Sequence, residues 1–308
     1  MLKEQLITIA GEEYLFTNRI GENQELLSSF NELAKHSFGI SFHEVGGDYE
    51  PHVLVRNHKV CANISVNQVP FMVNGVKKLY IQLGTVMTLE SERKKGLSRW
   101  LMEAIIKEWR TKCDAIYLFA NDSVLDFYPK FGFVAKDEYD YRMAGVGTYF
   151  DSATGSKKVS SQPDLLHLDM SQESSYELVK EKYKEGNSFA TIYMIENKGI
   201  FEFYYRGLMN ENIYYIEEYD VVVTAGLEED ALICYEILGT TKASLIQILK
   251  AVAAEFDKEE IVLGFTPIDT RGFVCQLHEE EDTTLFVNRV GENPMENRRW
   301  MFPVLTHA

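Results

Sequence analysis

Apolar and polar positions follow two different periods in the first half of the chain, and together they predict a mixed α/β fold. Some segments repeat apolar side chains every three to four positions, the spacing of an amphipathic helix. Others are short, largely apolar or alternating runs of the strand type. In chain order these segments are residues 23–39 (helix), 52–66 (two strands), 77–89 (strand), 97–109 (helix), 114–121 (strand), 123–134 (short helix) and 133–143 (strand).

The second half repeats a similar order more loosely. Its expected segments are residues 165–169 (strand), 171–185 (helix), 189–195, 199–207, 212–226 and 231–239 (strands), 242–256 (helix), 260–265 (strand) and 273–290 (a strand pair around an acidic turn). Between the halves, residues 151–163 are small and polar with no apolar periodicity, which is typical of a linker. We therefore expect two domains, residues 1–150 and residues 164–308.

The charge of the chain is concentrated in the second half. Residues 1–150 carry 17 Lys and Arg against 19 Asp and Glu, whereas residues 151–308 carry 14 against 28, for a net charge of −16 over the chain. Such a surface repels nucleic-acid phosphates and favours cationic partners. We expect no nucleic-acid partner.

The sequence offers no sign of secretion, membrane insertion or metal binding. No window approaches the roughly 20 apolar residues of a membrane span, and the N-terminus lacks the apolar core of a secretory signal. The cysteines Cys61, Cys113, Cys234 and Cys275 are widely separated, which predicts neither a disulfide framework nor a zinc site. We expect a cytoplasmic protein with no membrane partner and no metal.

A basic turn interrupts this acidic background between an expected strand and an expected helix. In the segment TLESERKKGLSRW, residues 88–100, four cations surround Gly96. Backbone amides at a helix N-terminus and nearby cations form a site for anions, above all for a pyrophosphate. A charged corner that faces water explains the same residues equally well.

Two short motifs resemble the GNAT N-acetyltransferase superfamily. RKKGLS, residues 93–98, is similar to the family's Q/R-x-x-G-x-G/A motif for acetyl-CoA, and it lies between a strand and a helix as that motif requires. NDSVLDFYPKFGF, residues 121–133, resembles the second signature, in which an Asn ends a strand, a Tyr follows seven residues later, and K-x-G-F comes next. The resemblance covers about residues 1–145.

The resemblance implies a site for acetyl-CoA. Strand backbone would hold the pantetheine arm, and the amides of the turn would hold the pyrophosphate; the residues implied are Val86, Met87, Thr88, Arg93, Lys94, Lys95, Gly96, Leu97, Ser98, Arg99 and Asn121. Tyr128 would protonate the departing thiolate after direct attack by an amine, while a strand amide near Met87 polarises the thioester carbonyl. Tyr128 as a plain core residue and Asn121 as a helix cap stay open alternatives.

The general base is not assigned by the sequence. Some members of the family have a glutamate eleven residues before the motif, where this chain has Gln82. His43, Glu44, His52 and His58 are other candidates, although such side chains in loops more often face solvent.

The resemblance implies a GNAT fold, with a central mixed, mostly antiparallel sheet flanked by helices, followed by a degenerate GNAT-like second domain. Two-domain acetyltransferases of the enhanced-intracellular-survival type have a comparable beginning. The implied function is acetyl-CoA-dependent N-acetyl transfer to a primary amine, on a small cationic molecule or a protein. The alternative is an inactive acyl-CoA-binding regulatory module, and homodimerisation stays open.

Overall fold

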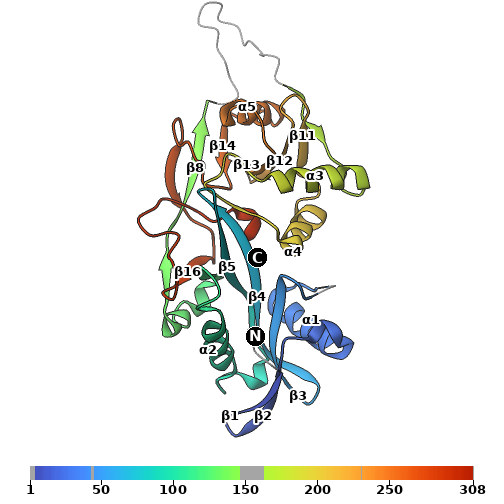
Figure 1. Cartoon of the computed structure of the whole chain (residues 1–308), viewed down its shortest axis with the longest axis vertical. Helices are drawn as coiled ribbons and strands as arrows, with labels where there is room; N and C mark the ends of the chain where they lie inside the picture. Colours follow the sequence, from blue (N-terminus) through green and yellow to red (C-terminus); the bar gives the residue numbers. More distant parts are fainter. Residues whose placement is uncertain (1–3, 43–44, 146–162, 230, 308) are drawn as a thin grey trace, which may run out of the picture. The chain divides into compact units, whose positions relative to one another are not determined.

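A computed structural model describes residues 4–42, 45–145, 163–229 and 231–307, and the chain divides into two compact units (Figure 1). Unit 1 comprises residues 1–69, 78–136 and 280–294, and unit 2 comprises residues 70–77, 137–279 and 295–308. The division therefore differs from the one expected at residues 151–163, of which residues 151–162 lie outside the described part of the chain. Each unit contains a segment that the sequence pattern assigned to the other half.

Unit 1 is built on a mixed sheet with two helices. In sheet order its strands are β1 (Gln5–Ile9), β2 (Glu12–Thr17), β3 (Tyr49–Arg56), β4 (Lys59–Val73), β5 (Val76–Thr88), β6 (Ala115–Ala120), β16 (Thr284–Asn288) and β7 (Phe133–Lys136). Its helices are α1 (Gln24–Phe38) and α2 (Leu97–Trp109), with 3₁₀ turns η1 (Ile20–Glu22), η2 (Glu90–Glu92), η3 (Asp122–Val124) and η4 (Tyr128–Phe131). The neighbours β5 and β6 run parallel, and the other pairs recorded along this order are antiparallel.

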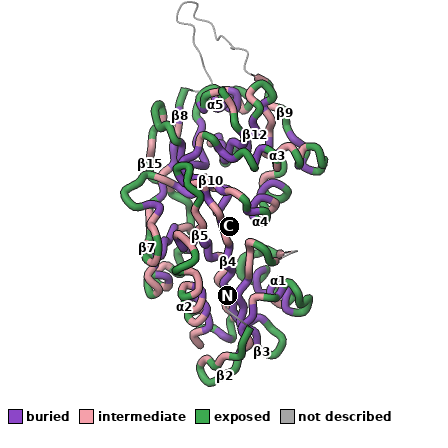
Figure 2. Tube along the Cα trace, viewed as in Figure 1, coloured by how far each residue is buried: buried purple, intermediate pink, exposed green. Residues whose placement is uncertain are grey.

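Each helix of unit 1 packs its apolar side chains on a separate buried cluster. Leu27 and Phe30 of α1 lie in one cluster with Val53 of β3, whereas Leu101 and Ile105 of α2 lie in another. Asn23 caps α1, since its side chain accepts hydrogen bonds from two first-turn amides. Figure 2 colours the chain by burial and shows buried positions along both the helices and the strands. The two periods in the sequence thus predicted both helices correctly.

The sheet of unit 2 has a strand order similar to that of unit 1 when it is read from β9 to β15, the reverse of the order given next. Its sheet runs β15 (Val274–His278), β8 (Glu138–Ala144), β14 (Glu260–Leu263), β13 (Ala231–Leu238), β12 (Val221–Glu228), β11 (Ile213–Ile216) and β9 (Leu166–His167). The other elements are α3 (Glu173–Glu185), β10 (Ile192–Met194), α4 (Lys198–Glu202), η5 (Phe203–Leu208), α5 (Leu245–Glu255) and η6 (Val304–Thr306). As with β5 and β6, β13 and β14 are a parallel pair inside an otherwise antiparallel order.

The two sheets exchange their last strands. β8 follows β7 in the chain but pairs with β14 and β15, and β16 follows β15 but pairs with β6 and β7 (Figure 1). The expected strand pair at residues 273–290 is therefore wrong, because β15 and β16 belong to different sheets. Residues 1–150 alone lack a strand from the interior of the first sheet.

One expected strand is a helix. Residues 199–207 lie in α4 and in the π-helical turn η5. Their buried side chains Ile200, Phe201, Tyr204 and Tyr205 follow a helical spacing, and Asn197 caps the start by accepting from the Ile200 amide at 2.8 Å. The aromatic residues favoured a strand in the sequence analysis, but they pack as one helical face.

The C-terminal residues of unit 2 bond to the chain just after β14. The Val304 amide donates to the Gly264 carbonyl at 2.9 Å, and the Met301 amide donates to Thr266 Oγ1 at 2.9 Å. The turn η6 also packs against β13. Residues 301–306 therefore lie against the ends of the parallel pair of this sheet.

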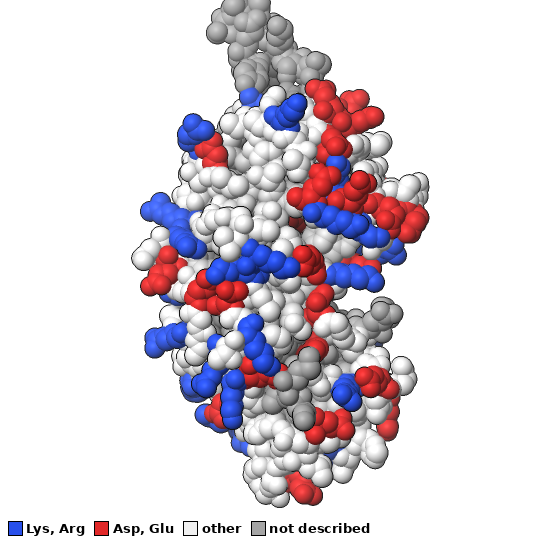
Figure 3. Space-filling view, in the orientation of Figure 1, with Lys and Arg blue, Asp and Glu red and all other residues white. Residues whose placement is uncertain are grey.

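Acidic side chains crowd around α3 and the strands beside it in Figure 3, with Lys and Arg side chains between them. No helix among the described residues is long and apolar enough to cross a membrane.

Unit 2 also buries a carboxyl group, that of Glu236, which forms no ion pair with any residue that the structure describes. Glu236 on β13 is 5 % exposed, and its carboxyl accepts a hydrogen bond from the Tyr205 hydroxyl at 2.9 Å. Burial raises the pKa of Glu236 from 4.5 to about 7. The folded state therefore holds this proton to a higher pH than the unfolded chain does.

We predict that this group makes the protein less stable as the pH rises from about 4.5 to about 7, because only the unfolded chain releases the proton freely there. The loss is on the order of 3 kcal/mol. Glu236→Gln keeps an acceptor for Tyr205 and should flatten this part of the pH dependence in urea unfolding. Glu228→Gln is the control, since Glu228 is exposed and also accepts a tyrosine hydroxyl. Equal slopes for Glu236→Gln and the parent protein would refute the prediction.

Candidate active site

A cleft opens where β5 and β6 part. The two strands pair at Tyr80–Ala115, Ile81–Ile116 and Gln82–Tyr117, and no pair is recorded between them beyond this point in the described residues. A cavity of about 890 Å³ occupies the gap. It is lined by His36, Ser37, Phe38, Leu83, Gly84, Thr85, Val86, Met87, Thr88, Glu92, Arg93, Lys94, Gly96, Leu97, Ser98, Arg99, Phe119, Asn121, Ser123, Val124, Phe127, Tyr128 and Asp282. Apart from Lys95, all the residues that the sequence proposed for the site lie on this lining.

The basic turn presents the N-terminus of α2 to the cleft. Gly96 is the N-cap residue at φ 94°, and Lys94 has φ 66°, so the chain turns sharply before the helix begins. The first amides of α2 have no acceptor within the helix and carry the positive end of its dipole. Ser98 in the first turn bonds the Thr88 hydroxyl at 2.6 Å, which ties α2 to the end of β5. This geometry suits a pyrophosphate lying against the turn.

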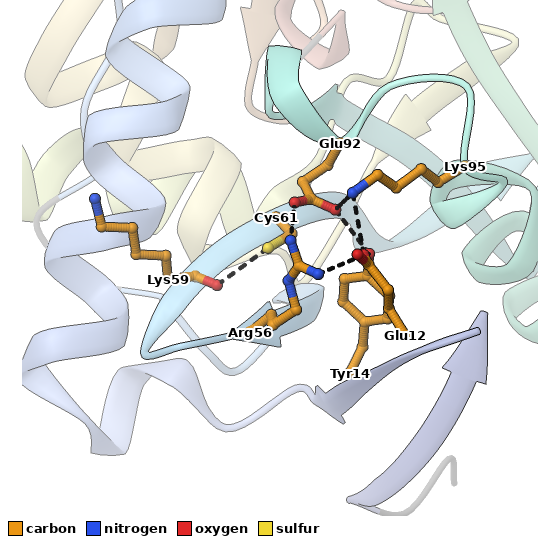
Figure 4. A network of polar contacts seen from close by, with 7 residues as sticks. All are labelled: Glu12, Tyr14, Arg56, Lys59, Cys61, Glu92 and Lys95. Carbon is orange, nitrogen blue, oxygen red and sulfur yellow. Dashed lines mark hydrogen bonds and ion pairs between the residues drawn. The ribbon is translucent and has the colours of Figure 1, made fainter. Parts of the chain in front are cut away.

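Lys95 belongs to an ion-pair network rather than to the cleft (Figure 4). Its ammonium bonds Glu92 at 2.9 Å and Glu12 at 3.0 Å, and Arg56 pairs with the same two carboxylates. The Tyr14 hydroxyl lies 2.7 Å from Glu92. Burial acts to raise the pKa of Glu92, but the bonds from Tyr14 and Lys95 and the charge of Arg56 outweigh it and lower that pKa. The network fastens the basic turn to β2 and β3.

Asn121, at the end of β6, is held by a residue from the far end of the chain. Its Nδ2 donates to the Asp282 carboxylate at 2.9 Å, and the Asp122 amide donates to the same carboxylate at 2.7 Å. These two bonds lower the pKa of Asp282. Asp282 lines the cleft only because the segment that contains β16 joins unit 1, so its place could not be read from the sequence.

Tyr128 has both a core and a cleft environment. Its side chain is 4 % exposed and packs against Phe127, Phe133 and, at 5.7 Å between ring centroids, Phe286 of β16. Burial raises the pKa of Tyr128 to about 12. The phenol therefore keeps its proton at neutral pH.

The structure separates the candidates for a general base. Gln82 is fully buried and accepts a hydrogen bond from Asn67 at 3.2 Å. His52 is 1 % exposed beside Phe16, and burial lowers its pKa, so it is a core residue. His58 is exposed near Glu25, away from the cleft lining. His43 and Glu44 lie outside the described residues.

His36 is an imidazole on the cleft that the sequence analysis did not select. It lies in the last turn of α1, beside Ser37 and Phe38 on the lining. It is an exposed position of an amphipathic helix, which gave no signal of function. The end of α1 reaches the cleft only through the fold.

Residues 20–133 match the model of the acetyltransferase (GNAT) family, and this range contains the cleft, the basic turn and Tyr128. The chain contains a GNAT acetyltransferase domain. Domains of this family transfer an acyl group from acyl-CoA to an amine, and the chain is accordingly assigned to the acyltransferases. No curated protein matches the sequence.

Solved structures share the fold across both units. A probable N-acyltransferase from Enterococcus faecalis V583 aligns with a TM-score of 0.57 at 12% identity, over 86% of this chain and 70% of its own. A GCN5-related N-acetyltransferase from Anabaena variabilis aligns at 0.57 and 12%, over 90% and 73%. Eis1 from Mycobacterium abscessus aligns at 0.55 and 12%, over 88% and 72%. At this identity the likeness concerns the fold, which therefore extends beyond the family match.

Unit 2 has a cavity of its own, of about 830 Å³, between α3 and α4 and with Tyr176, Tyr193 and Phe201 on its walls. Its charged groups largely pair with one another, as Lys180 does with Glu177 and Arg206 with Glu173. Among the described residues, no group of three or more His, Cys, Asp or Glu side chains is placed to hold a metal ion.

The ion-pair network predicts different roles for two neighbouring lysines. Lys94→Met should weaken acetyl-CoA binding about tenfold, because a cation leaves the cleft, and should not change the melting temperature. Lys95→Met should lower the melting temperature by a few degrees, because the buried Glu92 loses a partner. Calorimetric titration and thermal unfolding of both variants measure the two effects. Equal effects of the two substitutions on both quantities would contradict this division.

Proposed function

We propose that the protein is an acetyl-CoA-dependent N-acetyltransferase that acts on a primary amine. The observation that carries this proposal is the cleft between β5 and β6, which has the N-terminus of α2 on its lining and Tyr128 beside it. The amides of residues 96–99, with Arg93, Lys94 and Arg99, would bind the pyrophosphate. The backbone of Val86, Met87 and Thr88 would bind the pantetheine arm.

In this mechanism the amine nitrogen attacks the thioester carbonyl directly. The new C–N bond forms, the C–S bond breaks, and the electron pair of that bond leaves on sulfur. A backbone N–H of β5 stabilises the negative charge that develops on the carbonyl oxygen. Tyr128, whose phenol is protonated, gives its proton to the thiolate.

We propose His36 as the group that removes the proton from the amine. Gln82 occupies the place of the glutamate that some GNAT proteins use, and an amide does not accept the proton of an ammonium group. Imidazole is the commonest general base in enzymes. His36 brings this group to the cleft lining.

A second candidate function rests on Gln82. If no side chain replaces the missing glutamate, the domain binds acyl-CoA and regulates a partner without turnover. A thiol-release assay decides between the two functions. It is run with acetyl-CoA and small cationic amines, such as polyamines and aminoglycosides, and with lysine peptides. Binding of acetyl-CoA without thiol release for any acceptor would favour the regulatory module, and absence of binding would overturn both functions.

Tyr128→Phe should lower kcat about a hundredfold, because the thiolate loses its proton donor. The dissociation constant for acetyl-CoA should stay within about twofold, since the ring still packs against Phe133 and Phe286. Tyr80→Phe is the control, because it removes a buried phenol on β5 that bonds Glu292 outside the cleft lining. An unchanged kcat for Tyr128→Phe would remove this residue from the mechanism.

His36→Asn should lower kcat about a hundredfold near neutral pH. The deficit should shrink as the pH rises, because the amine then deprotonates in solution and needs no base. His58→Asn is the control, as His58 is an exposed histidine of unit 1 that is not on the cleft lining. The pH–rate profiles of the three proteins are compared. A deficit of the same size at every pH would exclude His36 as the base.

A further inference from the structure

Thr85 of β5 has an unusual backbone conformation at the cleft. Its φ is 44°, in the left-handed region, which a β-branched residue rarely adopts. It comes three residues after Gln82, where the pairing of β5 with β6 ends, and it lines the cleft. Such a backbone persists only when surrounding contacts hold it, and it is typical of functional sites.

Three hydroxyl groups form a closed ring that includes Thr85. The Tyr49 hydroxyl lies 2.6 Å from Thr85 Oγ1, Thr85 Oγ1 donates to Ser65 Oγ at 2.8 Å, and Ser65 Oγ donates to the Tyr49 hydroxyl at 2.9 Å. If Tyr49 donates to Thr85, each hydroxyl gives one hydrogen bond and accepts one. Tyr49 is anchored in turn, because its ring stacks on Phe42 at 5.0 Å and Asn31 of α1 holds both backbone polar groups of Phe42.

Asn63 fixes the peptide group that follows Thr85. Asn63 is fully buried on β4, and its Nδ2 donates to the Thr85 carbonyl at 2.8 Å and to Ser65 Oγ at 3.0 Å. The N–H of a trans peptide points away from its C=O. Since β4 and β6 lie on opposite sides of β5, a Thr85 carbonyl directed at β4 turns the Val86 N–H toward the gap between β5 and β6.

The alternating direction of the backbone N–H groups along β5 predicts the same direction for the Val86 N–H. The Leu89 amide donates to the Cys61 carbonyl of β4 at 2.8 Å. Successive N–H groups of a strand point to opposite sides, so the amides of Thr88 and Val86 face away from β4. Val86, rather than Met87, therefore presents its N–H to the cleft.

We propose that Tyr49, Asn63 and Ser65 are positioning residues for acyl transfer, which hold Thr85 in its left-handed conformation and so aim the Val86 N–H at the thioester carbonyl. The inference rests on the proposed function, because it concerns the oxyanion of that reaction. It adds to the site the buried Asn63 and Ser65 and the half-buried Tyr49, which are absent from the cleft lining and are therefore not expected to touch either substrate.

The test compares single hydroxyl deletions in the full chain. Tyr49→Phe and Ser65→Ala should each lower kcat about tenfold or more, since a misdirected oxyanion donor weakens transition-state binding. The dissociation constant for acetyl-CoA should stay within about twofold. Ser29→Ala is the matched control, because Ser29 is a hydroxyl of α1 that accepts from the Val60 amide of β4 at 3.0 Å, outside the ring.

A second background shows whether the ring acts through Thr85. Glycine adopts a φ of this sign without strain and has no hydroxyl for the ring. In a Thr85→Gly protein, adding Tyr49→Phe should therefore cause little further loss of kcat. If the losses of the two substitutions multiply instead, Tyr49 does not act through Thr85.

The outcomes separate the inference from the proposed function. If the parent protein neither binds acetyl-CoA nor releases thiol with any acceptor, the proposed function fails and the inference fails with it. If the parent protein is active and the ring variants match Ser29→Ala in kcat, the inference alone is wrong. A loss of acetyl-CoA affinity in proportion to the loss of kcat would also overturn it, because it would indicate general damage to the cleft.

Discussion

The separation of β5 from β6 beyond Gln82 and Tyr117 is the constraint on which the site depends. Two parallel strands that stopped pairing inside a sheet would expose backbone polar groups, which is costly unless a ligand or another segment bonds them. Here the Asn63 side chain of β4 donates a hydrogen bond to the Thr85 carbonyl. This bond satisfies a backbone group of β5 at the point where β5 leaves β6. The cleft is therefore produced by side chains on the neighbouring strand as well as by the two strands that border it.

The exchanged strand β16 connects the far end of the chain to this cleft. Phe286 packs against Tyr128, and Asn288 Nδ2 donates to the Phe131 carbonyl at 3.0 Å. Asp282, just before the strand, holds Asn121. The position of Tyr128 and of the end of β6 thus depends on residues more than 150 positions away in the sequence. The same contacts make residues 280–294 part of unit 1, although the family match ends at residue 133.

The sequence pattern predicted features that depend on residues close to one another in the chain, such as helices and the turns that precede them. The period of residues 97–109 gave α2, and the turn around Gly96 lies at the N-terminus of that helix as expected. Pairing between distant segments leaves no such mark, so the exchange of β8 and β16 was missed. Lys95 shows the same limit. The sequence does not distinguish a lysine of the turn that lines the cleft, such as Lys94, from one that pairs with carboxylates, such as Lys95. Its pairing with Glu12 and Glu92 depends on where β2 lies. Which strand amide faces the cleft depends in the same way on the bond from Asn63.

Unit 2 shows that the order of strands and the chemistry of the cleft are separable. Its parallel pair β13 and β14 occupies the same place in the sheet order as β5 and β6. Beyond the last pair, at Cys234 and Leu263, the chain after β14 bonds Met301 and Val304 of the C-terminal segment. The Gly264 carbonyl and Thr266 Oγ1 thus find partners within the chain. The turn after β13, GTTK at residues 239–242, lacks the basic motif that precedes α2 in unit 1. Unit 2 therefore has the strand order of unit 1 without the basic turn that opens α2.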